Sequence, residues 1–285
     1  MYFLFDIGGT KMRLAVSPDG ETFGEPKIVE TPKDFEEGVA LFKKIYKELT
    51  SGSKVEKAVG GIAGPFNRSK EALINSPHLP GWNGKPLKQK LTEAVGVEVY
   101  LENDTAMAGL GEATKGAARD FEIVVYMTIS TGVGGVRIVD KKIDANVFGF
   151  EPGHQTIDAD GTIYPRSIAF EGGGNFGHLD SYVGGAGIQR RLGKKPSEIK
   201  DEKILDEMAR LLAFGLNNTI VHWSPDVVVL GGGMIQEEVI SIGRVKFHLK
   251  NILKIFPELP EIKKAELGDL GGLHGALAYL RQLHK

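Results

Sequence analysis

Two glycine-rich turns carry residues whose types and spacing could bind a phosphate chain. DIGGTK occupies residues 6–11 and STGVGG occupies residues 130–135, and each follows an apolar run. Successive backbone N–H groups in such turns form an anion-binding concavity, and the carboxylate of Asp6 could hold a magnesium ion through water. Paired glycines are also good hairpin residues, because glycine accepts positive φ. Either turn alone is a weak indication, but the pair favours a phosphate site.

A third glycine cluster, VVVLGGGM, occupies residues 227–234 between an apolar run and a predicted helix. A strand that leads into glycines and a helix N-terminus favours a nucleotide, although close packing of strand and helix is an adequate alternative. The chain has no GxxxxGK[ST] motif and is therefore not a P-loop enzyme. The GxGxxG string at residues 172–177 follows no convincing strand, so we do not interpret it as a dinucleotide fingerprint.

Asn103 and Asp104 stand between the apolar run VEVYL and a predicted helix. Side chains of Asn and Asp at this position commonly accept hydrogen bonds from the first backbone N–H groups of the helix. From the residues alone, helix capping is therefore the simplest interpretation of this pair.

Composition excludes several classes of protein. The chain has 285 residues, 38 glycines, no cysteine and a net charge of −2. There is no basic excess for binding nucleic acid, and disulfides and thiolate metal sites are impossible. No apolar run approaches the ~20 residues of a membrane span, and the first residues lack the segments of a signal peptide. We expect a cytoplasmic protein without nucleic-acid or membrane partners.

The elements that must position these residues repeat along the chain. A strand, a glycine turn and a second strand, followed by alternating helices and strands, occur once from Met1 and again from Phe121. In the first half, a helix is predicted to begin at Thr31 as N-cap and Pro32. Such alternation predicts an α/β fold with mostly parallel central sheets. Two similar halves predict a ligand cleft between them. The predicted strands cover residues 1–5, 11–17, 26–30, 58–63, 97–101, 121–129, 136–139, 226–230 and 262–267, and the later helices cover 86–95, 105–114, 202–222, 237–253 and 273–284.

The ordered motifs DIGGTK, LENDTAMAGLGEA, STGVGG, EPGH, LDSYVGG, VVVLGGG and GGLHGAL resemble those of the ROK family of sugar kinases over nearly the whole chain. The resemblance implies a two-lobed, actin/hexokinase-like α/β fold, a duplicated ribonuclease H-like fold with an interdomain cleft. The small N-terminal lobe would comprise residues 1–115 and 271–285, and the large lobe residues 116–270. Some members are repressors with an added helix-turn-helix, for which the first turn at residue 6 leaves no room, so the kinase branch is expected. Homodimers are usual in the family.

The resemblance also implies ATP and Mg²⁺ as cofactors and assigns the three glycine clusters to the nucleotide. The nucleotide-binding residues implied are Asp6, Gly8, Gly9, Thr10 and Lys11 in the first turn, Thr131, Gly132, Gly134 and Gly135 in the second turn, and Gly231, Gly232 and Gly233 near the adenosine.

For the pair Asn103-Asp104, the resemblance reverses the capping interpretation. It implies that Asp104 is the catalytic base, which takes the proton of the attacking sugar hydroxyl, and that Asn103 orients the sugar. The other sugar-binding residues implied are Gly64, His78, Glu151, His154 and Asp180. Two of them depart from the family pattern, because His78 stands where asparagine is usual and Asp180 where glutamate is usual.

Many ROK kinases bind structural zinc through three cysteines and the histidine of ExGH. Here the cysteine positions hold Glu171, Gly173 and His178. An altered site of His154, Glu171 and His178 is chemically permissible, but these residues lack the fourth ligand of a closed structural site. We therefore favour the absence of a metal at this place.

The leading hypothesis is an ATP-dependent hexose kinase that forms a sugar 6-phosphate, with glucose as the first choice of acceptor. N-acetylmannosamine, fructose and mannose are the alternatives, and the missing zinc motif favours the first of them. A catalytically silent, sugar-sensing ROK protein is the non-enzyme alternative. The intact Asp104 and both glycine turns argue against that alternative.

Overall fold

The computed structural model describes residues 1–163 and 177–283. The chain forms two compact units, each described here by itself. The first unit comprises Met1–Lys115, Lys141–Gly149 and Asp269–Lys285, and the second comprises Gly116–Asp140 and Phe150–Gly268.

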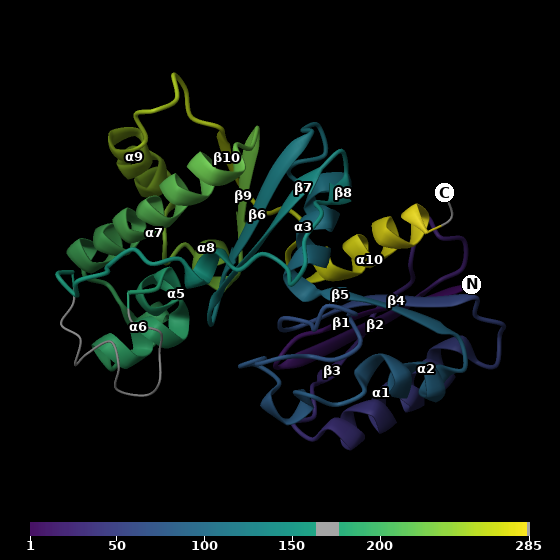
Figure 1. The fold of residues 1–285 in the computed structure, drawn as a ribbon. Coiled ribbons are helices and arrows are strands. Elements are labelled where there is room, and N and C mark those ends of the chain that lie inside the picture. The colour runs from purple at the N-terminus through teal and green to yellow at the C-terminus, as the bar shows by residue number, and fades with distance from the viewer. Residues whose placement is uncertain (164–176, 284–285) are drawn as a thin grey trace. The chain divides into compact units, whose positions relative to one another are not determined.

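The sheet of the first unit lies between two pairs of helices (Figure 1). Its strand order is β3-β2-β1-β4-β5, in which β2 runs antiparallel to its neighbours and β4 and β5 run parallel to β1. Alternate residues of β1 face opposite sides: Phe3 and Phe5 pack with α1 and α2, and Leu4 packs with α3 and α10. The elements are β1 (Tyr2–Ile7), β2 (Lys11–Ser17), β3 (Lys27–Glu30), α1 (Phe35–Thr50), β4 (Lys57–Ile62), η1 (Pro80–Trp82), α2 (Leu87–Val95), β5 (Glu98–Asn103), α3 (Asp104–Thr114), β8 (Lys142–Ile143), η4 (Gly268–Leu270) and α10 (Gly271–Gln282).

The second unit is built around strands in the order β10-β9-β6-β7. Strand β7 runs antiparallel to β6, whereas β9 runs parallel to both β6 and β10. Val125, Met127 and Ile129 of β6 pack in one core with residues of α7 and α9. The elements are β6 (Ile123–Ile129), β7 (Val133–Val139), η2 (Pro152–His154), α5 (Leu179–Val183), α6 (Gly185–Leu192), η3 (Pro196–Glu198), α7 (Glu202–Trp223), β9 (Val227–Gly231), α8 (Gly233–Gln236), α9 (Ile242–Ile252) and β10 (Glu261–Lys264).

These two mixed sheets with their helices confirm the predicted α/β class. Two details differ from expectation. Residues 141–149, expected in the second lobe, belong to the first unit, where the Gln282 side chain donates to the Lys141 carbonyl at 2.7 Å. Of the helix expected over residues 237–253, only α9 forms, and it begins at Ile242, after the short α8 has ended at Gln236.

The predicted start of the first long helix was wrong. Helix α1 begins at Phe35, and its N-cap is Asp34, whose carboxylate accepts a hydrogen bond from the Glu37 N–H. Thr31 lies before the helix, and its N–H and hydroxyl groups both bond to the turn of residues 8–10. Thr31 therefore does not cap the helix, because its hydrogen-bonding groups bind the turn instead.

Helix α10 packs closely on α3 through glycine. A Cβ atom added at Gly275 would lie 1.7 Å from the carbonyl oxygen of Met107 in α3, so no side chain fits there. Because Asp104 is the first residue of α3, this contact fixes the element that carries the predicted catalytic base.

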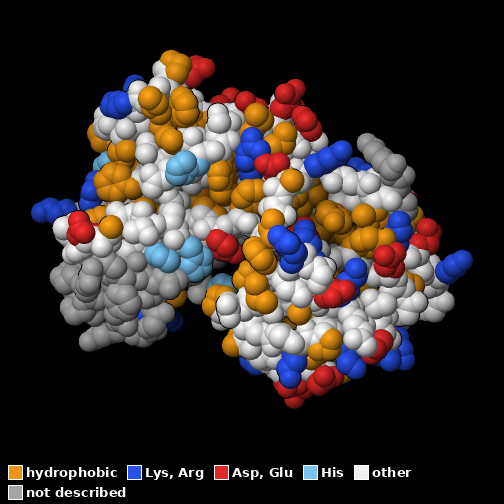
Figure 2. Space-filling model, viewed as in Figure 1, with side chains coloured by type: hydrophobic (Ala, Val, Ile, Leu, Met, Phe, Trp, Pro, Cys, Tyr) orange, Lys and Arg blue, Asp and Glu red, His pale blue; other side chains and the backbone are white. Residues whose placement is uncertain are grey.

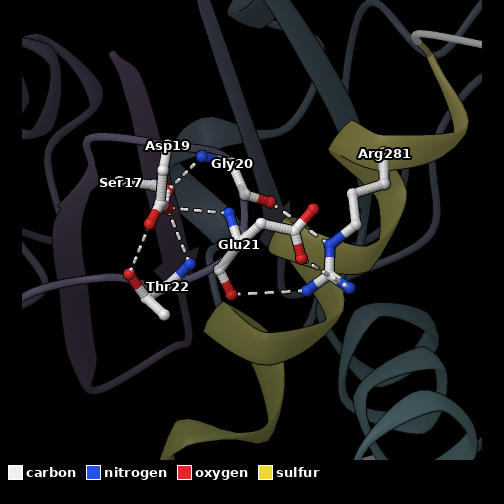
Figure 3. Close-up of polar contacts among 6 residues, drawn as sticks. All are labelled: Ser17, Asp19, Gly20, Glu21, Thr22 and Arg281. Atoms are coloured by element: carbon white, nitrogen blue, oxygen red, sulfur yellow. Dashed lines mark hydrogen bonds and ion pairs between the residues drawn. The ribbon is translucent and has the colours of Figure 1, made fainter.

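The turn after β2 is joined to α10 by polar contacts (Figure 3). The Asp19 carboxylate accepts hydrogen bonds from the N–H groups of Glu21 and Thr22, both at 2.8 Å. These bonds, that of Thr22 foremost, lower the pKa of Asp19 to about 2. The Arg281 guanidinium donates to the Gly20 carbonyl at 3.2 Å and pairs with the Glu21 carboxylate at 3.4 Å. The end of α10 is thereby held beside β2.

The charges on the surface and the hydropathy of the helices can be described for the same residues. On the face shown in Figure 2, Lys and Arg side chains are interspersed with Asp and Glu, without a broad basic area. Within residues 1–163 and 177–283, no helix combines the length and the hydropathy that a membrane span requires.

The close packing of α10 on α3 predicts that Gly275→Ala lowers the thermal stability strongly. The added methyl group must displace the helix backbone, and such overpacking costs at least ~1–3 kcal/mol, so we expect Tm to fall by roughly 5 °C or more. Calorimetry measures this difference. The control is Gly243→Ala in α9, where the nearest atom to an added Cβ is the Ser241 hydroxyl at 3.6 Å. An unchanged Tm for Gly275→Ala would contradict the contact.

Candidate active site

The first glycine turn connects β1 to β2 through residues 8–10, and the carbonyl groups of all three residues accept hydrogen bonds. The Gly8 carbonyl accepts from the Thr31 hydroxyl at 2.7 Å, and the Thr10 carbonyl accepts from the Thr31 N–H at 2.9 Å. The Gly9 carbonyl accepts from Lys33 Nζ at 2.7 Å. Within the described part of the chain, no group accepts a hydrogen bond from the N–H of Gly9 or Thr10. The turn therefore has two adjacent N–H groups that could bind an anion.

The two glycines of this turn are not explained by backbone φ. Neither Gly8 nor Gly9 has a positive φ, so the hairpin explanation from glycine's φ preference does not apply. A Cβ atom at Gly9 would lie 2.7 Å from the Cβ of His78. Residue 9 must be glycine because another backbone segment of the unit approaches it closely.

Asn103 and Asp104 lie at the start of α3, and Asn103 provides the cap. The Asn103 side chain is the N-cap of α3, since its Oδ1 accepts from the Ala106 N–H at 3.1 Å and its Nδ2 donates to the Gly64 carbonyl at 3.1 Å. Asp104 follows it as the first residue of the helix and accepts only locally, from the Thr105 N–H at 2.8 Å. The capping interpretation thus holds for Asn103 and leaves the Asp104 carboxylate available for chemistry.

The environment of Asp104 favours a basic carboxylate. Asp104 is partly exposed, yet desolvation by the surrounding protein is the largest effect on its pKa and raises it. The Thr105 N–H and the charge of His78 act in the opposite direction. A raised pKa makes a carboxylate a better proton acceptor near neutral pH.

Asp6, at the end of β1, lies in the same group of charges. It is buried, and burial together with the charge of Asp104 raises its pKa to about 7. The Arg13 guanidinium, 3.3 Å from the Asp6 carboxylate, opposes this shift, and it also binds the exposed carboxylate of Asp269 at 3.0 Å. Asp6 and Asp269 thus share one guanidinium, and Asp104 lies near enough to Asp6 for its charge to raise the pKa of Asp6.

The carboxylates of Asp6 and Asp104 are chemically suited to bind a divalent cation. Mg²⁺ prefers carboxylate oxygen ligands, commonly one or two from the protein together with water and phosphate. Burial is the main cause of the raised pKa of Asp6 and the charge of Asp104 adds to it, so a bound cation would favour the ionised form of Asp6. Asp6 is therefore the residue that would hold Mg²⁺, as the sequence predicts.

Two glycines that the sequence analysis did not assign to the site allow these carboxylates to approach each other. Gly61 of β4 is the register partner of Asp6, and a Cβ atom there would lie 2.8 Å from the Cα of Asp104. A Cβ atom at Gly272 of α10 would lie 2.6 Å from the Asp6 carboxyl carbon. The available signal was glycine inside a strand, in AVGGIAG, which often marks a close backbone approach.

The second glycine turn, in the second unit, is held in a similar way. The Ser130 and Thr131 carbonyls accept hydrogen bonds from the N–H groups of Gly185 and Ala186, at 2.8 and 2.9 Å. The Gly132 carbonyl accepts from the Ser130 N–H at 2.8 Å. Among residues 1–163 and 177–283, none accepts from the N–H of Thr131 or Gly132. This turn, too, leaves two N–H groups for an anion.

The other glycines assigned to the nucleotide lie on neighbouring strands. Gly134 and Gly135 are in β7, paired with Thr128 and Met127 of β6. Gly231 ends β9, and Gly232, at a φ of +84°, precedes the first residue of α8, Gly233. A Cβ atom at Gly232 would lie 2.3 Å from the carbonyl of Ile129, the residue before the second turn. The second turn and the late cluster are therefore adjacent.

Asp180 lies against the second turn. Its Oδ1 accepts a hydrogen bond from the Val133 N–H at 2.7 Å, and a Cβ atom at Gly132 would lie 2.9 Å from the same oxygen. The sequence places this residue among the sugar ligands. The structure adds a backbone contact at the turn that sequence pattern alone did not predict.

The EPGH segment is joined to the same part of the second unit. Glu151 precedes η2 and is exposed, and a Cβ atom at Gly153 would lie 2.1 Å from the Val133 carbonyl. The Nδ1 atoms of His154 and His178 lie 3.3 Å apart. Burial, and then the proximity of His154, lower the pKa of His178.

Two imidazoles do not complete a structural zinc site, which takes four ligands. The third candidate, Glu171, lies outside the described residues. Within the described ranges, no group of three or more His, Cys, Asp or Glu side chains could hold a metal ion. The described residues therefore do not fit the family's zinc site.

The raised pKa of Asp6 predicts a specific pH dependence of stability. The folded protein binds this proton more tightly, with a pKa of about 7, than the unfolded chain, whose ordinary value is 3.8. The contribution of Asp6 to stability is therefore greatest below about pH 4 and falls as the pH rises to about 7. Asp6→Asn removes this loss, so its Tm should rise relative to that of the wild type between pH 4 and 7, without metal or nucleotide.

The control for this prediction is Asp269→Asn, which removes the exposed carboxylate that binds the same Arg13 guanidinium. Its Tm should change with pH in parallel with that of the wild type. A difference between Asp6→Asn and wild type that stays constant from pH 4 to 7 would show that Asp6 titrates normally.

Comparison with known proteins agrees with this arrangement. The model of the ROK family matches residues 2–283. The chain is 29% identical over 301 residues to an N-acetyl-D-glucosamine kinase of Pectobacterium atrosepticum, covering 97% of both chains. It is 28% identical to the N-acetyl-D-glucosamine kinase of Mannheimia succiniciproducens, covering 98% of both.

Solved structures show the same fold. The ROK hexokinase from Thermus thermophilus has a TM-score of 0.83 at 27% identity, covering 100% of this chain and 99% of that one. A ROK family glucokinase from Streptomyces griseus, in complex with glucose and AMPPNP, has a TM-score of 0.80 at 25% identity, covering 99% of both. These similarities confirm the predicted actin/hexokinase-like fold class. The chain belongs to the ROK family.

Proposed function

We propose that the protein is an ATP-dependent kinase that transfers the γ-phosphoryl group to the 6-hydroxyl of a hexose. The observation that carries the proposal is the position of Asp104 at the start of α3 together with the raised pKa of its carboxyl group. Asn103 provides the cap of α3, so the Asp104 carboxylate is not needed as the cap, although it accepts a hydrogen bond from the Thr105 N–H. Desolvation raises the pKa of Asp104, which favours a role as general base. Related ROK kinases of nearly equal length support the reaction class.

In this reaction the sugar oxygen forms a bond to the γ-phosphorus while the bond from that phosphorus to the leaving oxygen of ADP breaks. Asp104 accepts the hydroxyl proton and later releases it to solvent. The N–H groups of Gly9 and Thr10, and those of Thr131 and Gly132, bind phosphate oxygens. Mg²⁺, held by Asp6, would supply positive charge that offsets the charge of the phosphates.

We propose glucose as the acceptor, supported by the similarity to the hexokinase and to the glucokinase that binds glucose. N-acetylglucosamine is the second candidate, because the curated relatives named above are N-acetyl-D-glucosamine kinases. The two sugars share the 6-hydroxyl that Asp104 would deprotonate and differ at the 2-substituent. Asn103, Gly64, His78, Glu151, His154 and Asp180 are the residues proposed to bind the sugar.

The test is a coupled ADP-release assay with ATP, Mg²⁺ and a panel of glucose, N-acetylglucosamine, N-acetylmannosamine, mannose and fructose. We expect turnover with at least one sugar. Asp104→Asn should reduce kcat by at least ~10²-fold, because the amide cannot accept the proton.

The matched control is Asp201→Asn, which changes the carboxylate that caps α7, where it accepts from the Lys203 N–H at 2.8 Å. It should keep its activity. Sugar binding without ADP release by the wild type would instead support the silent, sugar-sensing alternative. Full activity of Asp104→Asn would show that another group is the base.

A further inference from the structure

Thr31 makes two hydrogen bonds to the first glycine turn, one at each side. It lies between β3 and α1 and is 5% exposed. Its hydroxyl donates to the Gly8 carbonyl at 2.7 Å, and its N–H donates to the Thr10 carbonyl at 2.9 Å. One buried residue therefore fixes the orientation of the first and last peptide groups of the turn.

Lys33 completes this arrangement at the middle of the turn. Its ammonium group donates to the Gly9 carbonyl at 2.7 Å, and its side chain is exposed. With the carbonyls of all three turn residues engaged by Thr31 and Lys33, the peptide groups cannot rotate to present oxygen in place of N–H. An anion would meet N–H groups only, and rotation of one peptide would replace a donor by a repelling oxygen.

The turn also lies beside the groups that act on the transferred phosphoryl group. The Cβ of His78 occupies the space above Gly9, and the charge of His78 acts on Asp104. Asp6 lies two residues before Gly8, the first residue of the turn. Because the transferred group must come within reach of the hydroxyl that Asp104 deprotonates, a phosphate bound by this turn would be the terminal one.

We propose that Thr31 is a positioning residue for the terminal phosphate of ATP, which it does not touch but whose binding turn it holds in the donor-presenting conformation. This inference rests on the proposed function, since it assumes that the turn binds ATP. It adds a residue that motif resemblance does not assign.

The experiment compares binding of AMPPNP and of ADP, each with Mg²⁺ and without sugar, by titration calorimetry. Thr31→Val keeps the shape but leaves the Gly8 carbonyl without its donor. We expect AMPPNP to bind about tenfold more weakly and ADP, which lacks the terminal phosphate, to change less than about threefold. Thr31→Ser keeps the hydroxyl and should restore AMPPNP affinity to within about threefold of wild type.

The matched control is Thr219→Val. Thr219 is 4% exposed, and its hydroxyl donates to the Gly215 carbonyl of α7 at 3.0 Å and accepts from the Gln155 side chain at 3.2 Å. The same atoms are thus changed in the second unit, away from the first glycine turn. Its AMPPNP affinity should equal that of the wild type. Unchanged AMPPNP binding by Thr31→Val, equal weakening of AMPPNP and ADP, or no rescue by serine would each overturn the inference while leaving the proposed function intact.

A second measurement does not depend on nucleotide. The Gly8 N–H donates across the turn to the Lys11 carbonyl at 2.9 Å. Hydrogen exchange at this amide should be faster in Thr31→Val than in Thr31→Ser or wild type, and equal rates would show that Thr31 does not hold the turn. A wild type that binds neither nucleotide would overturn the proposed function, and the phosphate role of Thr31 with it.

Discussion

A peptide group can present either its N–H or its carbonyl oxygen to a ligand. The proposed binding of phosphate by the two glycine turns requires that the N–H groups face the ligand. In the first turn, Thr31 and Lys33 bind the carbonyls from a segment between β3 and α1. In the second, the N–H groups at the start of α6 bind the carbonyls of Ser130 and Thr131. The two units meet one electrostatic requirement with different elements. Neither arrangement needs a side chain that touches the anion.

The carboxylates of the first unit impose a second constraint, because they must lie close together in a place that desolvates them. Glycines at positions 61 and 272 give the space for that approach. The raised pKa of Asp6 and of Asp104 is its electrostatic consequence. The unit thus keeps an arrangement that is unfavourable for folding at neutral pH but suitable for binding a cation and accepting a proton, as at many functional sites.

Local pattern predicted most of the strands and helices, because alternation and helical spacing follow directly from which face is buried. It failed at Thr31, where TPKD offers two good caps, Thr31 and Asp34, and only the distant turn decides between them. The functions of Gly61 and Gly272 depend on strand register and helix packing that no local window contains. The family resemblance of the motifs predicted roles for Asp6, Asp104 and both turns. The hydrogen bonds that orient the turns could not be predicted in this way, because they depend on residues that the folded chain brings to the turns.

The first unit is assembled from segments far apart in the sequence, and its last helix, α10, packs against both α3 and Asp6. During synthesis, β1 to α3 leave the ribosome long before α10 exists, so their apolar face around Leu4 and Val59 waits uncovered while the whole second unit is made. The approach of Gly272 to the Asp6 carboxyl group is therefore the last contact of this aspartate to form. A prematurely terminated chain would lack the acidic pair's packing partner and would expose that face to chaperones and proteases.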